Sequence, residues 1–360
     1  MIYFALILLL FLLSFLNQID LEKRFILILE FFVFALFLLF GGLRYKVGAD
    51  WDSYEVLFNG VSSIEEVVKS REEKLYMISN FLIKIIFDNY SFFVFVFFLI
   101  AFVLKFNVIK LYSKDVFLSL MIYVYGVLLI YDFNGIRQGM AMSFIMLSIP
   151  FILNKSFVRF SLLIIIACFF HISAIVFLPF YFLSRMEISN SKLLFIIILS
   201  ILVATPLRLI IQNSLFYQLF MASETFSHYS TYTDGNSYQI NTPILSIALF
   251  QRLIIFCLFI ASYDSMKIDS YLKLLLRNAY FLSIVIFLLL SFSDQFAARI
   301  SFNYKLVEIL MVPAILSAVS NKYLRILLLI FFLILSMVGT DRLISVPDGY
   351  LLPYRNLLFM

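Results

Sequence analysis

Residues 157–183 read FVRFSLLIIIACFFHISAIVFLPFYFL, an almost unbroken apolar run with Arg159 near its start and Arg185 just beyond its end. Short loops that carry arginine or lysine stay in the cytoplasm, so both ends of this run belong on the same side of a membrane. The run therefore crosses twice and turns near His171. Each limb has about 14 residues, or about 21 Å, and is shorter than the hydrocarbon core. We expect a membrane hairpin whose turn is recessed and is reached by water and substrate.

The rest of the chain is equally apolar. Of the 360 residues, 64% are hydrophobic and 14% are charged, and the mean hydropathy is +1.04. Soluble domains are nearer half apolar and a quarter charged, so these values exclude an ordinary soluble fold. About twelve spans of about 20 residues would occupy roughly two thirds of the chain. The composition therefore predicts an all-α, polytopic integral membrane protein with about twelve transmembrane helices, in a single membrane domain over residues 1–360.

Basic residues predict the orientation of the helices, because short loops rich in Lys and Arg face the cytoplasm. Such loops contain Lys23/Arg24, Lys105/Lys110/Lys114, Lys155/Arg159, Arg185/Lys192, Lys267/Lys273/Arg277 and Lys322/Arg325. Loops 43–74 and 212–242 are then expected outside, and the second of them has no Lys or Arg. Residues 75–87 form an amphipathic segment that we expect to be re-entrant or interfacial. With this assignment both termini lie outside.

The reactive residue types exclude several classes of function. Cys168 and Cys257 lie inside apolar runs, which excludes a disulfide framework and a thiolate metal site. The two histidines, His171 and His228, are far apart in the sequence. We therefore expect neither a metal nor a cofactor, with ligands gathered from distant helices as the alternative. The net charge of +5 comes from basic residues dispersed among apolar helices, which is not the pattern of a nucleic-acid-binding protein.

Arginines within spans or at their outer ends are candidate ligands for an anion, because a charge in the membrane needs a partner. Arg44, Arg137, Arg208 and Arg299 lie near predicted helix ends, where a single arginine usually extends to the lipid headgroups. Arg252 lies deep within its span and needs either a protein carboxylate or a substrate anion. Several guanidinium groups on one side of the bundle suit a phosphate or diphosphate, which each can bind through two hydrogen bonds.

Two side chains are candidates for proton transfer. His171 is a candidate general base near neutral pH, and its alternative is a hydrogen-bonded residue of a tight turn. Nearby arginines would lower the pKa of His171 and keep it neutral. Asp50, which follows an early span together with Asp52, is a candidate catalytic or acceptor-binding carboxylate, and its alternative is a cap or turn residue.

Four short motifs occur in order along the chain. The first is Arg-Tyr-x-Val-Gly-x-Asp-x-x-x-Tyr, at Arg44 to Tyr54. The second is Asn-x-Ile-Arg-Gln-Gly-x-Ala, at Asn134 to Ala141, and the third is His-x-Ser-Ala, at His171 to Ala174. The last is Pro-Tyr-Arg-Asn, at Pro353–Asn356. This ordered set resembles the EpsG/Wzy-type polymerases of oligosaccharide repeat units.

The resemblance implies a glycosyltransferase with a GT-C-like fold in the bacterial cytoplasmic (inner) membrane. Such an enzyme joins repeat units into O-antigen, capsule or exopolysaccharide on the outer face of that membrane. Donor and acceptor would be oligosaccharides on undecaprenyl diphosphate, and a chain-length regulator and a flippase of the same pathway would be partners. Taken with the residue pattern, it predicts catalytic roles for His171 and Asp50. Predicted substrate-binding residues are Arg44, Tyr54, Arg137, Gln138, Arg252 and Arg299.

Two other functions fit parts of the pattern. A lipid-linked glycan flippase or polysaccharide transporter would also place arginines against a diphosphate. The absence of an internal sequence repeat, the acidic loop after Arg44 and the outward polar residues argue against it. A membrane O-acyltransferase would use a histidine, but it gives no reason for several outer arginines.

Overall fold

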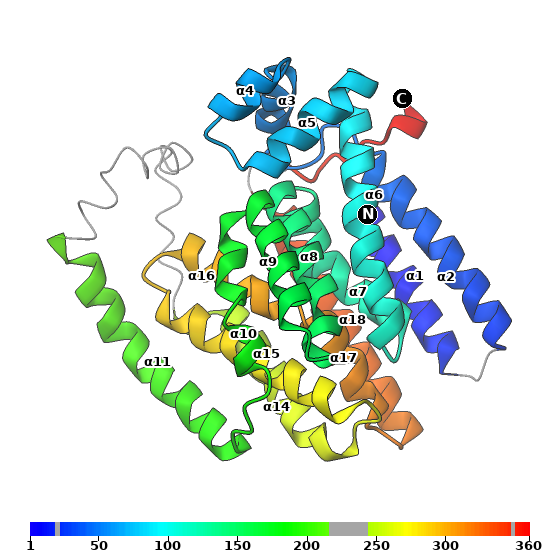
Figure 1. Ribbon diagram of the computed structural model, residues 1–360. Coiled ribbons are helices and arrows are strands. Elements are labelled where there is room, and N and C mark those ends of the chain that lie inside the picture. The colour runs from blue at the N-terminus through cyan, green and yellow to red at the C-terminus, as the bar shows by residue number, and fades with distance from the viewer. Residues whose placement is uncertain (19–21, 216–243, 347–349) are drawn as a thin grey trace.

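The computed structural model describes residues 1–18, 22–215, 244–346 and 350–360, and every regular element within these ranges is a helix (Figure 1). Among the described residues, seven helices are long and apolar enough to cross a membrane. They are α2 with η1 (Lys23–Gly42), α6 (Tyr90–Tyr112), α8 (Ile136–Leu153), α11 (Asn190–Gln212), α14 with η4 (Ile247–Ser265), α15 (Ser270–Leu289) and α18 (Lys322–Ile344). The predicted all-α, multi-pass membrane protein is confirmed.

The remaining apolar helices are shorter. A bent pair, α16 (Asp294–Lys305) and α17 (Glu308–Ser317), meets at 48° and would make an eighth span if it crosses as one unit. The other short elements are α1 (Ile2–Asn17), α7 with η2 (Val116–Asp132), α9 (Phe157–Phe170) and η3 with α10 (Ile172–Leu183). Each has fewer than the roughly 20 residues of a full span. The expected number of twelve spans is therefore not confirmed.

The hairpin predicted for residues 157–183 is present. Helix α9 ends at Phe170, and His171 takes an extended conformation before η3 (Ile172–Phe177) and α10 (Phe180–Leu183). The two limbs run back along each other, because the ring of Phe157 lies 5.5 Å from that of Phe182. The turn therefore falls at His171, as the charges at the two ends of the run indicated.

Three short helices form a cap over one end of the bundle (Figure 1). They are α3 (Trp51–Asn59), α4 (Ile64–Lys69) and α5 (Lys74–Ile86). The cap occupies the predicted outside loop 43–74 and the amphipathic segment 75–87, so this loop is folded. Helix α5 is too short to span and packs against α3, α4, α6 and α9. The other predicted outside loop, 212–242, falls almost wholly outside the described residues.

Local chemistry explains the cap. Ser63 and Glu66 form a capping box that begins α4. Lys84 of α5 donates to the carbonyl oxygens of Phe58, at 3.2 Å, and Asn59, at 2.8 Å, and so satisfies the C-terminal end of α3. The ring of Tyr76 on α5 is fully buried among aromatic rings of α3 and α6. Aromatic packing and backbone hydrogen bonds thus join the cap to the bundle.

A buried ion pair holds the centre of the bundle. Lys105, which the charge pattern placed in a cytoplasmic loop, lies instead within α6 and is fully buried. Its ammonium group is 2.8 Å from one carboxylate oxygen of Asp132 and 2.9 Å from the carbonyl oxygen of Gly139. Tyr123 also donates to Asp132. The loop assignment of Lys105 is therefore wrong, since a buried carboxylate provides its partner.

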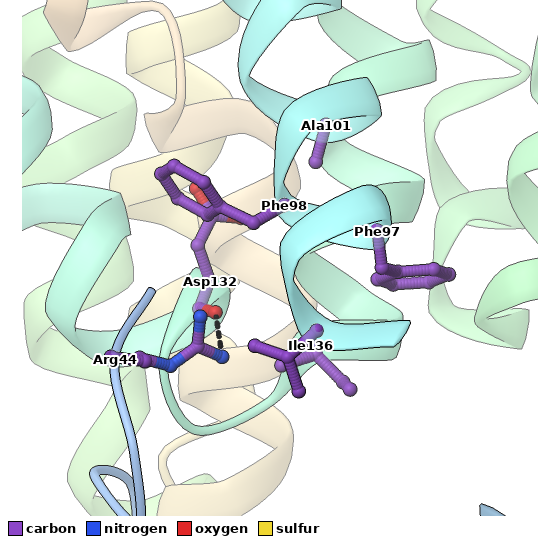
Figure 2. A pocket seen from close by; sticks show the side chains of 7 residues that line it. Arg44, Phe97, Phe98, Ala101, Asp132 and Ile136 are labelled. Carbon is purple, nitrogen blue, oxygen red and sulfur yellow. Dashed lines mark hydrogen bonds between the residues drawn. The ribbon is translucent and has the colours of Figure 1, made fainter. Parts of the chain in front are cut away.

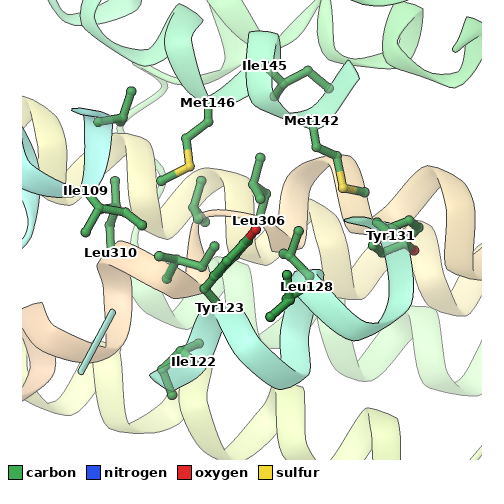
Figure 3. Close-up of a cluster of buried hydrophobic side chains, with 14 of the residues drawn as sticks. Ile109, Ile122, Tyr123, Leu128, Tyr131, Met142, Ile145, Met146, Leu306 and Leu310 are labelled. Carbon is green, nitrogen blue, oxygen red and sulfur yellow. The ribbon is translucent and has the colours of Figure 1, made fainter. Parts of the chain in front are cut away.

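Buried apolar side chains join four helical segments, and one of them, Tyr123, also contacts this ion pair. They come from α6, from α7 with η2, from α8, and from residues at the start of α17 (Figure 3). Those labelled are Ile109, Ile122, Tyr123, Leu128, Tyr131, Met142, Ile145, Met146, Leu306 and Leu310. This cluster packs η2 against α8, whose first residues carry the second motif, Asn134 to Ala141.

Candidate functional site

Asp50, Arg137, His171 and Arg299 share one neighbourhood, which we call the Asp50 cluster. Burial raises the pKa of Asp50, while the positive charges of Arg299 and Arg137 act to lower it. Burial lowers the pKa of His171 to about 3, and the same two arginines act in the same direction. Both arginines therefore lie close to both titratable groups. Four segments far apart in the sequence meet here: the start of α3, the start of α8, the hairpin turn and α16.

Asp50 is positioned by the turn that precedes α3. Gly48 has a φ of +121°, and a Cβ at this position would collide with the carbonyl oxygen of Phe133. The amide of Ala49 donates to Oδ1 of Asn134 at 2.7 Å. Asp50 stands at the N-cap of α3, but its side chain makes no capping hydrogen bond. Its partly buried carboxylate is therefore available to the cluster, although Asp50 does occupy the turn and cap position that the alternative named.

Arg137, in the first turn of α8, is paired with two carboxylates of the protein. Its guanidinium group forms ion pairs with Glu72 and Glu73, which precede α5. Its charge also lies 5.6 Å from the ring of Tyr54 and 5.7 Å from that of Tyr76. Arg137 thus ties the cap to the bundle. The ring of Tyr54 is buried against it, and the predicted substrate contact of Tyr54 stays a prediction. A substrate anion at Arg137 would have to share the guanidinium with these carboxylates.

Gln138 and Asn303 hold α16 beside the start of α8. Gln138 Nε2 donates to the carbonyl oxygen of Arg299 at 2.8 Å. Asn303 Nδ2 lies 3.3 Å from the same oxygen and 2.9 Å from the carbonyl oxygen of Ser173. The backbone that carries Arg299 is therefore fixed against both α8 and the hairpin. In this structure Gln138 positions Arg299, and its predicted contact with substrate stays a prediction.

Arg44 lies apart from the Asp50 cluster. Only 2% of its surface is exposed, and it donates to the carbonyl oxygens of Gly41, at 2.8 Å, and Asp132, at 2.9 Å (Figure 2). The ring of Phe133 packs 4.7 Å from its guanidinium carbon. The cavity beside it has a volume of about 10 Å³, room for about one water molecule. The structure shows Arg44 joining two backbone segments, and its predicted substrate contact stays a prediction.

The C-terminal motif, Pro353–Asn356, supplies hydrogen-bond partners to the backbone around Arg44. Tyr354 donates to the carbonyl oxygen of Phe40 at 2.6 Å, and Asn356 donates to that of Leu39 at 2.9 Å. The amide of Tyr45 donates to the carbonyl oxygen of Arg355 at 3.0 Å. The last carbonyl groups of a helix have no partner within it, and here the two terminal motifs satisfy them. The first and last motifs are therefore one structural unit.

Arg252 is buried deep in the bundle, as its position in the span predicted. Only 1% of its surface is exposed; it donates to Ser301 at 3.0 Å and lies 4.1 Å from the ring centre of Phe287. Close by, at the break between α16 and α17, Lys305 pairs with Glu308 at 2.9 Å. The charge of Arg252 is not among those that shift the pKa of Asp50 or His171. Its role toward substrate stays a prediction.

Several residues that shape the site were not predicted from the sequence. Glu72 and Glu73 stand just before the predicted amphipathic segment 75–87, and no motif marked them. Ser173 was noted within a motif, and Asn303 carried no signal at all. His228 lies outside the described residues. Within the described ranges no three His, Cys, Asp or Glu side chains are grouped to hold a metal ion, and the expectation of no metal stays a prediction.

The chain matches the model of a known protein family. The model of the EpsG family matches residues 26–356, which include the whole Asp50 cluster and all four motifs. No curated protein and no solved structure matches the chain, so the GT-C-like fold stays a prediction. The match extends over nearly the whole sequence, which confirms the resemblance seen in the motifs. The chain belongs to the EpsG family.

Proposed function

We propose that this protein is a polysaccharide polymerase that joins oligosaccharide repeat units carried on a lipid diphosphate. The observation that carries the proposal is the Asp50 cluster, in which a carboxylate without a capping role lies beside two arginines and a histidine. Membership of the EpsG family supports the same activity class. In this proposal the enzyme works on the outer face of the bacterial cytoplasmic membrane, with undecaprenyl diphosphate as the lipid carrier.

The proposed reaction is a glycosyl transfer. A hydroxyl group of the acceptor sugar attacks the anomeric carbon of the donor, and the bond from that carbon to the diphosphate oxygen breaks. The electron pair of the broken bond stays on the diphosphate, where the positive charge of Arg299 and Arg137 stabilises it. Asp50 accepts the proton of the attacking hydroxyl. Burial raises the pKa of Asp50, which makes its carboxylate a stronger base than an exposed aspartate.

A direct assay tests the proposal. The purified full-length protein, in lipid nanodiscs, is incubated with a repeat unit linked to undecaprenyl diphosphate, and the products are separated by length. We expect a ladder of products that differ by one repeat unit, together with release of lipid diphosphate. Recovery of the single repeat unit alone, from protein that remains folded, would overturn the proposal. In cells, loss of a polymerase leaves single-repeat glycan at the surface.

Arg137 can be tested for substrate contact separately from its structural role. We expect Arg137→Ala to lower polymer formation by about 10–100-fold, the effect of losing a charge-assisted contact, and also to lower Tm because Glu72 and Glu73 lose their partner. The matched variant adds Glu72→Gln and Glu73→Gln to Arg137→Ala. If Arg137 binds diphosphate, this triple variant regains Tm but not polymer. Recovery of both would show that Arg137 only ties the cap to the bundle.

A further inference from the structure

Hydrogen bonds at the hairpin turn determine which nitrogen of His171 carries the proton. The backbone amide of Ser173 donates to Nδ1 of His171 at 3.3 Å, and Oγ of Ser173 lies 2.7 Å from the same nitrogen. A backbone N–H can only donate, so Nδ1 must be an acceptor and has no hydrogen. In a neutral imidazole one nitrogen carries the proton, and here it is Nε2.

Asn303 of α16 strengthens this arrangement from the other side. It is fully buried, and its Nδ2 faces the carbonyl oxygens of Ser173, at 2.9 Å, and Arg299, at 3.3 Å. Carbonyl oxygens only accept, so the amide orientation of Asn303 is fixed by its surroundings. The same Nδ2 lies 3.4 Å from Oγ of Ser173 and donates to it. The hydroxyl hydrogen of Ser173 is thereby directed to Nδ1 of His171.

We infer that His171 is a neutral hydrogen-bond donor that presents Nε2–H to the departing diphosphate oxygen, and that Ser173 and Asn303 are the positioning residues that fix this tautomer. The inference rests on the proposed function and gives His171 a role other than that of a base. Both nitrogens are then committed: Nδ1 accepts two hydrogen bonds from Ser173, and Nε2 already carries a proton. Within the described part of the chain Nε2 has no hydrogen-bond partner, so it is available to a ligand.

The proton balance of the reaction assigns a separate task to each residue. The proton of the acceptor hydroxyl passes to Asp50, and the new carbon–oxygen bond forms as the bond to the diphosphate breaks. The imidazole of His171 keeps its proton throughout and only donates a hydrogen bond to the oxygen that gains charge. Burial and the two arginines keep this imidazole uncharged at neutral pH. A fixed donor of this kind stabilises the leaving oxygen without reorganisation.

Two substitutions at His171 distinguish a hydrogen-bond donor from a general base. His171→Ala removes the donor and is expected to reduce turnover by about 10²–10³-fold, the usual effect of losing one such donor. The amide of His171→Gln can accept from Ser173 and donate at the position of Nε2, so turnover within about tenfold of wild type is expected. If His171 were the base, the Gln variant would be as inactive as the Ala variant. That result would overturn the inference.

The tautomer itself can be measured without any activity. The full-length protein labelled with ¹⁵N-histidine contains only His171 and His228, so a His228→Gln variant assigns both imidazole spectra. At pH 7 we expect His171 to show an unprotonated Nδ1 and a protonated Nε2. The backbone amide of residue 173 still donates to Nδ1 in Ser173→Ala, so this variant and Asn303→Leu are expected to shift only part of the signal toward the other tautomer. A proton on Nδ1, or a charged imidazole, in the wild-type protein would overturn the inference.

The two proposals fail in different ways. If the expected tautomer is present but no lipid-linked repeat unit is polymerised, the proposed function fails and the hydrogen-bonding assignment stands. If the protein polymerises repeat units but Nδ1 carries the proton, the function stands and the donor role of His171 is wrong.

Discussion

Replacement of Asp50 by asparagine is expected to lower polymer formation by about 10²–10⁴-fold while the amount of folded protein stays at the wild-type level, because the substitution removes the proton acceptor and keeps the size of the side chain. The side chain of Asp50 makes no capping hydrogen bond, so α3 loses nothing that holds its first turn. The measurement is the rate of product extension in nanodiscs, with Tm as the control for folding.

Asp52 supplies the matched control. It lies two residues further along in the same first turn of α3, and it is exposed. Asp52→Asn removes the same charge from the same helix end but from outside the cluster, so nearly full activity is expected. Equal losses in the two variants would show that Asp50 acts only through the negative charge that it places at the start of α3. Asp50 would then not be the base.

The pH dependence of the polymerisation rate is also expected to show that Asp50 acts as the base. Burial raises the pKa of Asp50, so the basic carboxylate is lost at a higher pH than for an exposed aspartate as the solution becomes more acidic. The rate is therefore expected to fall on the acidic side of neutrality. The pKa of His171, at about 3, lies too low to contribute to the profile near pH 6.5. Single-turnover rates between pH 4 and 8 would show the position of the acidic limb.

Lys105→Met is expected to produce the largest loss of stability, about 3–5 kcal/mol. It removes one partner of a fully buried ion pair and leaves the carboxylate of Asp132 in the apolar interior, beside Tyr123. The expected result is a strongly reduced amount of protein in the membrane and a lower Tm of the purified fraction.

Lys69, on α4 of the cap, provides the comparison. It pairs with Glu65 at 2.6 Å, and both side chains are 73% exposed, so water can replace the partner. Lys69→Met is expected to cost about 0–1 kcal/mol. If both variants lowered Tm equally, burial of the Lys105–Asp132 pair would not be what stabilises the centre of the bundle.

The hairpin at His171 could be predicted from sequence because its two ends carry the same charge and its apolar length is too great for one span. The number of spans could not. Apolar composition does not distinguish a helix that crosses the membrane from a short helix packed inside the bundle, such as α7 or α10. The charge pattern placed Lys105 in a loop for a similar reason. Its partner Asp132 belongs to another helix, and only the fold brings the two residues together.

The sequence also identified only part of the candidate site. Motifs identified Asp50, Arg137 and His171, and the structure brings these three together with Arg299. Arg44 belonged to an equally clear motif, yet its partners are backbone carbonyl oxygens, which no pattern of side chains reveals. The pairing of Arg137 with Glu72 and Glu73 was hidden for a different reason. These carboxylates lie more than 60 residues from Arg137 in the chain, and only the fold brings them together.

Because the first and last motifs are hydrogen-bonded to each other, the turn before Asp50 forms only after the C-terminal residues have been synthesised. The carbonyl oxygens of Leu39 and Phe40 and the amides of Tyr45 and Gly48 take hydrogen-bond partners from residues 350–356. Every span has left the ribosome before these residues do. The turn that leads to Asp50 is therefore completed after translation has passed residue 356. A chain that stops earlier would insert its helices but would lack this turn. The backbone carbonyl and amide groups named above would then be without these partners and open to membrane proteases.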